Sequence, residues 1–163
     1  MPMNIIVCAK QVMDPETPAS AFRVDQEAKK VVSAQGIPPV VNGFDEQAVE
    51  AALRLKDSQG ANVTVIAMGD SFVLDVIKKP LSMGCDELIL LQDAAFENQP
   101  DAFFVASVLA AAIKKIGEYD LILCGRQASD WDMGVPITRP SRVLVSRPHR
   151  DEVIPPVPHS RGR

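Results

Sequence analysis

DLILCGRQASDWDMG, residues 120–134, joins a short aliphatic run to a polar segment with a glycine at each end. The aliphatic run is typical of a strand buried inside a parallel sheet. The change at Gly125 indicates that the strand opens directly into a loop. Ligands of open α/β sheets bind beyond the carboxyl ends of the strands, so this loop is the first place to look for a binding site.

Earlier segments of the chain repeat this pattern of strand and helix. Three more aliphatic runs precede the first one, at residues 4–9, 63–68 and 87–91. Apolar residues at helical spacing lie between the runs, from 45 to 60, from 71 to 81 and from 101 to 115. This alternation predicts βαβ units. We therefore expect an α/β fold: a doubly wound, mostly parallel sheet with helices on both faces, of the Rossmann-like type.

Local signals predict where several elements begin and end. Asn42-Gly43 breaks the chain before the first helix, and Gly60 ends that helix. Ser71 is the expected N-cap of the second helix, and Pro80 should kink or end it. The runs 22–24 and 30–32 flank a polar stretch, which indicates a small hairpin outside the main sheet.

Composition restricts the class of protein. The 163 residues suit one domain, and no apolar run approaches a membrane span, so we expect no integral membrane segment. The three cysteines, Cys8, Cys85 and Cys124, are too widely separated to indicate a disulfide framework or a zinc site. Buried thiols in a reducing cytoplasm are the simplest interpretation. We expect a cytoplasmic protein with no metal site.

Charge divides the chain into two parts. Residues 1–134 carry 11 Lys and Arg against 19 Asp and Glu, whereas residues 135–163 carry six Arg against two acidic residues. The acidic body argues against a nucleic acid partner, which requires a basic face. We expect a nucleotide-binding α/β domain over 1–134 and an irregular tail, rich in proline and arginine, over 135–163. His149 and His159 lie in this tail without carboxylate or cysteine partners, so no catalytic residue is nominated.

The loop after residue 124 has two interpretations that its residues alone leave open. Arg126, Gln127 and Ser129 carry groups that hydrogen-bond phosphate or ribose, and the flanking glycines permit a close backbone approach. The same loop also suits a polar surface turn. Trp131 either covers a nucleotide or closes the end of the sheet.

Other strand and helix ends leave similar alternatives. Asp45 suits helix capping, or contact with a ribose or with backbone. Lys10 follows the first strand, where its ammonium group either neutralises phosphate or stays in solvent. Met68 ends the second strand and is expected in the core, with its backbone or thioether as the only route to a ligand.

Four ordered blocks of the chain resemble electron transfer flavoprotein beta subunits. They are IIVCAKQV from residue 5, VNGFDEQAVEAALRLKDSQGANVTVIAMG from residue 41, LSMGCDELILL from residue 81, and DLILCGRQASDWDMG. The resemblance is collinear over residues 3–134, and the block beginning Cys-Gly-Arg-Gln-Ala is its most specific part.

The resemblance implies a fold similar to that of the adenine nucleotide alpha-hydrolases, and a carrier subunit and not an enzyme. It implies a heterodimer with an electron transfer flavoprotein alpha subunit, which shares the redox-active FAD. This subunit would hold AMP, or a second FAD in the bifurcating branch, and residues alone do not decide between them. Electrons would pass from flavoprotein dehydrogenases, such as the acyl-CoA dehydrogenases of fatty acid beta-oxidation, to a quinone-linked acceptor. The alternative is a free-standing adenine-nucleotide-binding module of the universal-stress-protein type.

The resemblance also assigns the cofactor-binding residues. Carried over by motif, they are Cys8, Ala9, Asn42, Gly43, Phe44, Asp45, Met68, Gly125, Arg126, Gln127, Ala128, Ser129, Asp130, Trp131, Asp132, Met133 and Gly134. The chain departs from the family pattern after Gly134, where Val135-Pro136 replaces the usual Gln and Gly. The sequence alone names neither the electron donor nor the role of residues 135–163.

Overall fold

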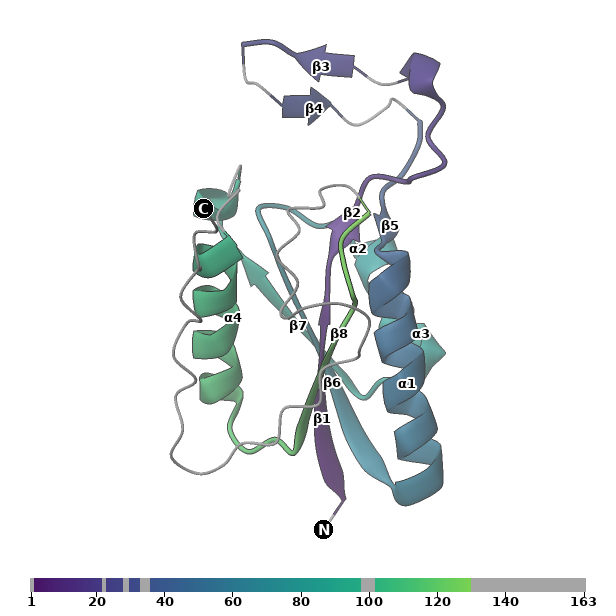
Figure 1. The fold of residues 1–163 in the computed structure, drawn as a ribbon, viewed down its shortest axis with the longest axis vertical. Coiled ribbons are helices and arrows are strands. Elements are labelled where there is room, and N and C mark those ends of the chain that lie inside the picture. The colour runs from purple at the N-terminus through teal and green to yellow at the C-terminus, as the bar shows by residue number, and fades with distance from the viewer. Residues whose placement is uncertain (1, 22, 28–29, 33–35, 98–101, 130–163) are drawn as a thin grey trace, which may run out of the picture.

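A four-stranded parallel sheet forms the centre of the molecule (Figure 1). The structure is a computed structural model that describes residues 2–21, 23–27, 30–32, 36–97 and 102–129. The strands of the sheet are β1 (Met3–Ala9), β6 (Ala61–Gly69), β7 (Glu87–Gln92) and β8 (Leu121–Cys124). They match the four aliphatic runs predicted from the sequence, with ends shifted by one or two residues.

The order of the strands creates a reversal beside β1. The sheet runs β7-β6-β1-β8, so the chain first builds outward from β1 through β6 to β7. It then crosses back and adds β8 on the other side of β1. The point between β1 and β8 is therefore the topological switch point, where the connections leave the sheet toward opposite faces.

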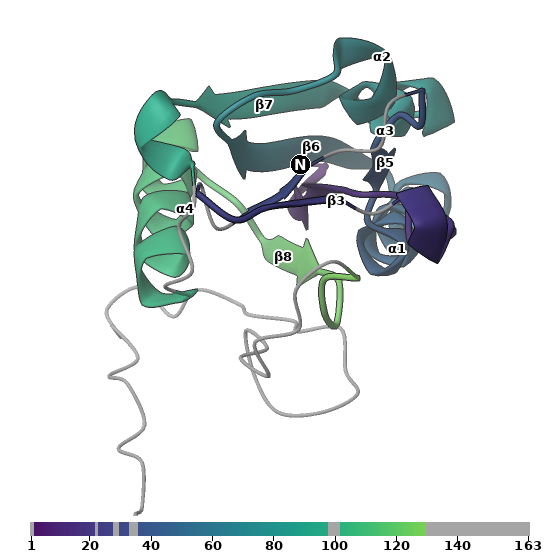
Figure 2. The same ribbon diagram turned by 90° about the horizontal axis from the view of Figure 1, so that it is seen from above.

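Helices cover both faces of the sheet (Figure 2). Helix α1 (Gly43–Gln59) and the short helices α2 (Leu74–Ile77) and α3 (Lys79–Met83) lie on one face, and α4 (Ala102–Ile116) lies on the other. Two apolar clusters follow from the alternation of side chains along the strands. One contains Val7 and Val49, and the other contains Ile6 and Ile113. The predicted α/β fold class is confirmed.

Two antiparallel pairs lie outside the main sheet. The predicted hairpin is confirmed as β3 (Arg23–Asp25) paired with β4 (Lys30–Val32). A second pair, β2 (Gln11–Val12) with β5 (Val40–Val41), joins the two segments of chain that lead to and from the hairpin. The sequence analysis did not predict this second pair. Figure 1 shows the hairpin standing away from the sheet, beyond β2 and β5. Two 3-10 turns, η1 (Ala19–Ala21) and η2 (Ala94–Phe96), complete the elements.

Helix ends follow the sequence signals in one case and depart from them in another. Gly60 ends α1 at φ 71°, a left-handed conformation that glycine adopts without strain, and its N–H donates to the Lys56 carbonyl. The prediction of one helix capped by Ser71 is wrong, because α2 begins at Leu74 after Val73. Helix α2 ends at its C-cap residue Lys78. Pro80 lies in the first turn of α3, where the N–H that proline lacks would have no partner within the helix.

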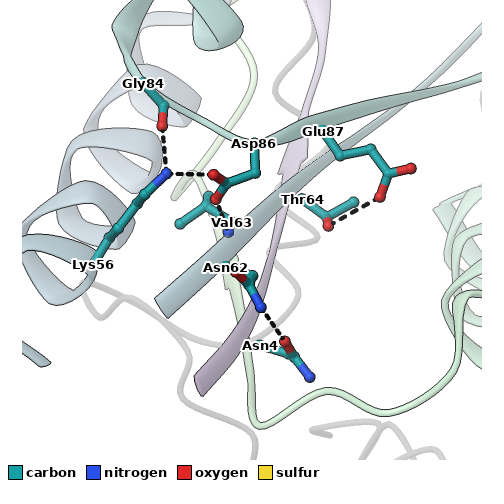
Figure 3. Close-up of polar contacts among 8 residues, drawn as sticks. All are labelled: Asn4, Lys56, Asn62, Val63, Thr64, Gly84, Asp86 and Glu87. Carbon is teal, nitrogen blue, oxygen red and sulfur yellow. Dashed lines mark hydrogen bonds and ion pairs between the residues drawn. The ribbon is translucent and has the colours of Figure 1, made fainter. Parts of the chain in front are cut away.

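Polar pairs hold together the edge of the sheet where the parallel strands begin (Figure 3). Lys56, near the end of α1, donates to the Gly84 carbonyl at 2.9 Å and to the Asp86 carboxylate at 2.5 Å. The second Asp86 oxygen accepts the Val63 N–H at 2.8 Å. Asp86 therefore links α1, β6 and the start of β7, and its hydrogen bonds to Lys56 and Val63 lower the pKa of its carboxyl group.

We predict that Asp86→Asn lowers the free energy of unfolding by about 1–2 kcal/mol at neutral pH, because it removes the charge that Lys56 contacts. A carboxyl group whose pKa is lowered in the folded state stabilises that state at pH values above its unfolded-state pKa. This contribution is lost as the pH falls through the folded-state pKa. The deficit of the variant should therefore shrink in acid. Urea unfolding at neutral and acidic pH measures it. Glu87→Gln is the matched control, since Glu87 makes only a 3.4 Å contact with Thr64, and an equal loss there would contradict the prediction.

Candidate functional site

The carboxyl ends of β1, β6 and β8 bring the predicted site residues to one edge of the sheet. Strand β1 ends at Ala9, which lies opposite Ala67 of β6, one residue before Met68. Cys124 ends β8 opposite Cys8, so Gly125 leaves the sheet beside the end of β1. The start of α1 packs against this same edge, which is the switch point of the fold.

Asp45 connects three segments of this edge with one carboxylate. It lies in the first turn of α1 and is only 7% exposed. Its Oδ2 accepts the Lys10 N–H at 2.8 Å, and its Oδ1 accepts the Gly125 N–H at 3.1 Å. The prediction that Asp45 caps the helix is wrong, because Asn42 is the N-cap residue. The Asp45 side chain instead accepts hydrogen bonds from backbone N–H groups that follow β1 and β8. The backbone contact weighed as an alternative is the one observed.

Asn42 fixes the loop after β8 in the same way. Its side chain is buried, at 1% exposed, and makes no capping hydrogen bond within α1. Its Nδ2 donates to the Gln127 carbonyl at 2.7 Å, and its Oδ1 accepts the Ser129 N–H at 3.3 Å. The Asn42 N–H donates to the Lys10 carbonyl at 2.9 Å. The Nδ2 and Oδ1 atoms of Asn42 therefore both bind the backbone of the loop after β8 and fix its path.

Gly125 is required at its position by the close approach of α1. A Cβ atom added there would lie 2.7 Å from both the Asp45 nitrogen and the Phe44 carbonyl carbon. These are backbone atoms of the helix start, so they cannot move aside as a flexible side chain would. The close backbone approach predicted at Gly125 is thus made to the protein's own helix α1.

Arg126 and Phe44 form the exposed rim of the site. The Arg126 guanidinium lies over the Phe44 ring, 4.9 Å from the ring centre, a cation–π contact. Arg126 is exposed, and Phe44 is half-buried at the start of α1. This contact holds an exposed cation at the end of β8.

Burial changes the proton affinity of Asp45. Loss of hydration raises the pKa of its carboxyl group to about 6, although the hydrogen bonds from Asn42, Lys10 and Gly125 act in the opposite direction. The negative charge at the switch point is therefore partly neutralised by backbone N–H groups, and it is readily removed in mild acid.

The structure brings together most of the residues named from the sequence. Cys8, Ala9, Asn42, Gly43, Phe44, Asp45, Met68 and Gly125–Ser129 all lie at this edge, whereas 130–134, with Trp131, and the predicted tail lie outside the described residues. Lys10 joins the edge through its backbone N–H and carbonyl, and the charge of its ammonium group also acts on Asp45. Contact of these residues with a cofactor stays a prediction. Within the described ranges, no cluster of three His, Cys, Asp or Glu is placed to hold a metal ion.

The sequence of residues 29–137 matches the family model of the electron transfer flavoprotein domain. The chain belongs to the electron transfer flavoprotein family. This match confirms the resemblance drawn from the four sequence blocks, and it favours that family over a universal stress protein. In the described part of the chain, no helix has both the length and the apolar character needed to cross a membrane.

Curated relatives in this family cover the same part of the chain. The electron transfer flavoprotein subunit beta of Clostridium acetobutylicum is 42% identical over 130 residues, which are 80% of this chain and 48% of that protein. The caffeyl-CoA reductase-Etf complex subunit CarD of Acetobacterium woodii is 40% identical over 131 residues, 80% of this chain and 48% of its own length. Protein FixA of Azorhizobium caulinodans is 37% identical over 134 residues, 80% and 46% respectively. The chain spans about half the length of the curated relatives it matches. Their names agree with the expectation of a carrier subunit.

We predict that Gly125→Ala lowers the free energy of unfolding by roughly 1–3 kcal/mol, because the methyl group overlaps the backbone of α1. Gly43→Ala is the control, since a Cβ at Gly43 meets nothing within 4 Å and its φ is not in the left-handed region. Urea unfolding of the two variants measures the difference. Equal stability of both would show that α1 moves away from β8 without cost.

We also predict that Asp45→Asn changes how stability depends on pH. In the folded chain, Asp45 binds a proton as the pH falls below about 6. In the unfolded chain, it stays ionised until the pH falls to the ordinary pKa of 3.8. Relative to the variant, the native chain should gain roughly 2 kcal/mol as the pH falls from 6 to 4. Urea midpoints across this range test the sign. Asp57→Asn, an exposed acid on the same helix, should leave the profile unchanged. Parallel profiles for the native chain and Asp45→Asn would contradict the assignment.

Proposed function

We propose that the chain is the nucleotide-binding part of an electron transfer flavoprotein beta subunit, and that an adenine nucleotide binds at the edge formed by β1, β6, α1 and β8. The observation that carries this proposal is the convergence of Lys10, Asp45 and Gly125 at the switch point. Open α/β sheets bind their ligands at such points. Family membership supports the same location, because the matched region includes α1, β6 and β8.

Arg126 supplies the group that an anionic phosphate requires. A guanidinium presents several donors in one plane, and stacking on Phe44 leaves its edge available. The nearby Asp45 would repel a phosphate if it were freely ionised. Its carboxylate is instead buried and accepts two backbone N–H groups, which disperses this charge.

Two kinds of residue make up the proposed site. Asn42 and Asp45 are buried and already use their polar atoms, so they shape the site and leave ligand contact to others. The contacting surface would come from more accessible residues of the same edge, which are Phe44, Met68, Arg126, Gln127, Ala128 and Ser129. Asp130, Trp131, Asp132, Met133 and Gly134 would complete the loop.

The chain would act by holding and orienting cofactors. A bound flavin supplies the redox chemistry of such carriers, whereas the protein sets position and electrostatics. An alpha subunit would complete the heterodimer and share its FAD, and this chain would hold AMP or a second FAD. Electrons would enter from cytoplasmic flavoprotein dehydrogenases, such as acyl-CoA dehydrogenases, and leave to a quinone-linked acceptor.

Co-expression of the chain with its cognate alpha subunit tests this function directly. Nucleotides released from the purified complex are identified by absorbance and mass. FAD with AMP supports an ordinary electron carrier, and two FAD per dimer support the bifurcating type. A complex without adenine nucleotide on this subunit would contradict the site, and absence of any complex would contradict the carrier role.

We predict that Arg126→Gln weakens binding of AMP or FAD by roughly 10- to 100-fold, because one charge-assisted contact to phosphate contributes about 1.5–3 kcal/mol. Arg54→Gln is the matched control, since Arg54 is an exposed arginine of α1 that pairs with Glu50. Calorimetric titration of the complex after nucleotide removal measures both. The loss at Arg126 should diminish in high salt. An equal effect of the two substitutions would remove Arg126 from the site.

A further inference from the structure

Cys8 and Cys124 form a pair of thiols that the proposed function does not use. The two residues are direct neighbours in the register of the parallel strands β1 and β8. Both cysteines are free in the structure. They come from opposite ends of the chain and meet only because β8 returns to the side of β1.

The spacing of the two strands suits a covalent link between these residues. Neighbouring strands lie about 4.8 Å apart, and disulfides join Cα atoms that are about 4.4–6.8 Å apart. Residues paired in register on neighbouring parallel strands leave the sheet on the same face, and Cys8 and Cys124 are such a pair. Cys8 packs with the apolar cluster beneath α4, which identifies that face.

The two thiols differ in exposure and in proton affinity. Cys8 is half-buried, whereas Cys124 is 9% exposed. Their interaction lowers the pKa of Cys124 and, with burial, raises the pKa of Cys8, so Cys124 is the more readily ionised of the two thiols. Asp45 disfavours a second negative charge on either sulfur. A thiolate held beside a protonated thiol is the arrangement from which dithiols are oxidised.

We propose that Cys8 and Cys124 are a modification site, at which a peroxide converts the thiol pair into a reversible disulfide between β1 and β8. One sulfur takes an oxygen atom from hydrogen peroxide and becomes a sulfenic acid, and one water is released. The other sulfur then attacks this sulfenic acid, the S–S bond forms, and a second water leaves. The two thiols lose two electrons in total, and the peroxide gains them.

Cys85 provides an internal comparison. It is buried near Lys56 and Asp86, in the apolar cluster on the α1 face of the sheet. Burial raises the pKa of its thiol to about 11, which leaves little thiolate at neutral pH. The third cysteine of the chain should therefore stay reduced under conditions that oxidise the pair.

The experiment treats the folded, full-length chain with hydrogen peroxide, denatures it, alkylates the remaining thiols with N-ethylmaleimide and analyses it by mass spectrometry. We expect the loss of two hydrogen atoms, one alkylated cysteine, Cys85, and a linked peptide that joins Cys8 to Cys124. Dithiothreitol should restore three alkylated cysteines. Peroxide treatment in urea should lower the yield of this link by about 10-fold, because the unfolded chain must close a long loop by diffusion.

Two variants complete the test. Cys85→Ser should form the same link, and Cys124→Ser, which removes the more readily ionised thiol, should form no link. The measurement on the native chain decides the proposal even if Cys124→Ser does not fold. Oxidation of Cys8 to a sulfinic acid with Cys124 still alkylated would overturn it. A link to Cys85, or three unmodified thiols, would also overturn it. No nucleotide takes part, so failure here would not contradict the proposed nucleotide site.

Discussion

The carboxylate of Asp45 links the segments that meet at the switch point of the sheet, between β1 and β8. It accepts the Lys10 N–H beyond β1 at 2.8 Å and the Gly125 N–H beyond β8 at 3.1 Å, and it belongs to α1. A buried charge is unfavourable unless hydrogen bonds compensate it, and here they come from the two segments that must meet. The helix start, the end of the central strand and the returning strand are therefore positioned by one side chain. Asn42 extends this control to the loop at Gln127 and Ser129.

The residues that fix the shape of this edge are different from the residues that face solvent. The least exposed polar residues, Asn42 and Asp45, use their side-chain atoms on the protein's own backbone. Gly125 has no side chain because the backbone of α1 lies against it. What faces solvent is a planar cation stacked on an aromatic ring. A ligand at this edge would thus meet a surface that is already organised, which lowers the entropy lost on binding.

Sequence patterns predicted the layers of the fold better than the contacts of the site. Aliphatic runs located every strand of the main sheet, because burial on both faces leaves a continuous apolar signature. The same patterns placed Asp45 at a helix start, where capping was the obvious role. Its actual partners lie 35 and 80 positions away in the chain, and periodicity carries no information about them. Ser71 and Pro80 misled for a related reason, since a short connection allowed two small helices instead of one.

The pairing of β2 with β5 bears on how this family can diversify. These two-residue strands close the base of the segment that carries the β3–β4 hairpin, so the chain returns to the start of α1 from a fixed point. Anything beyond that base can lengthen, shorten or change its residues without moving β1 or Asp45. The hairpin can therefore change in length or residues while the switch point stays in place.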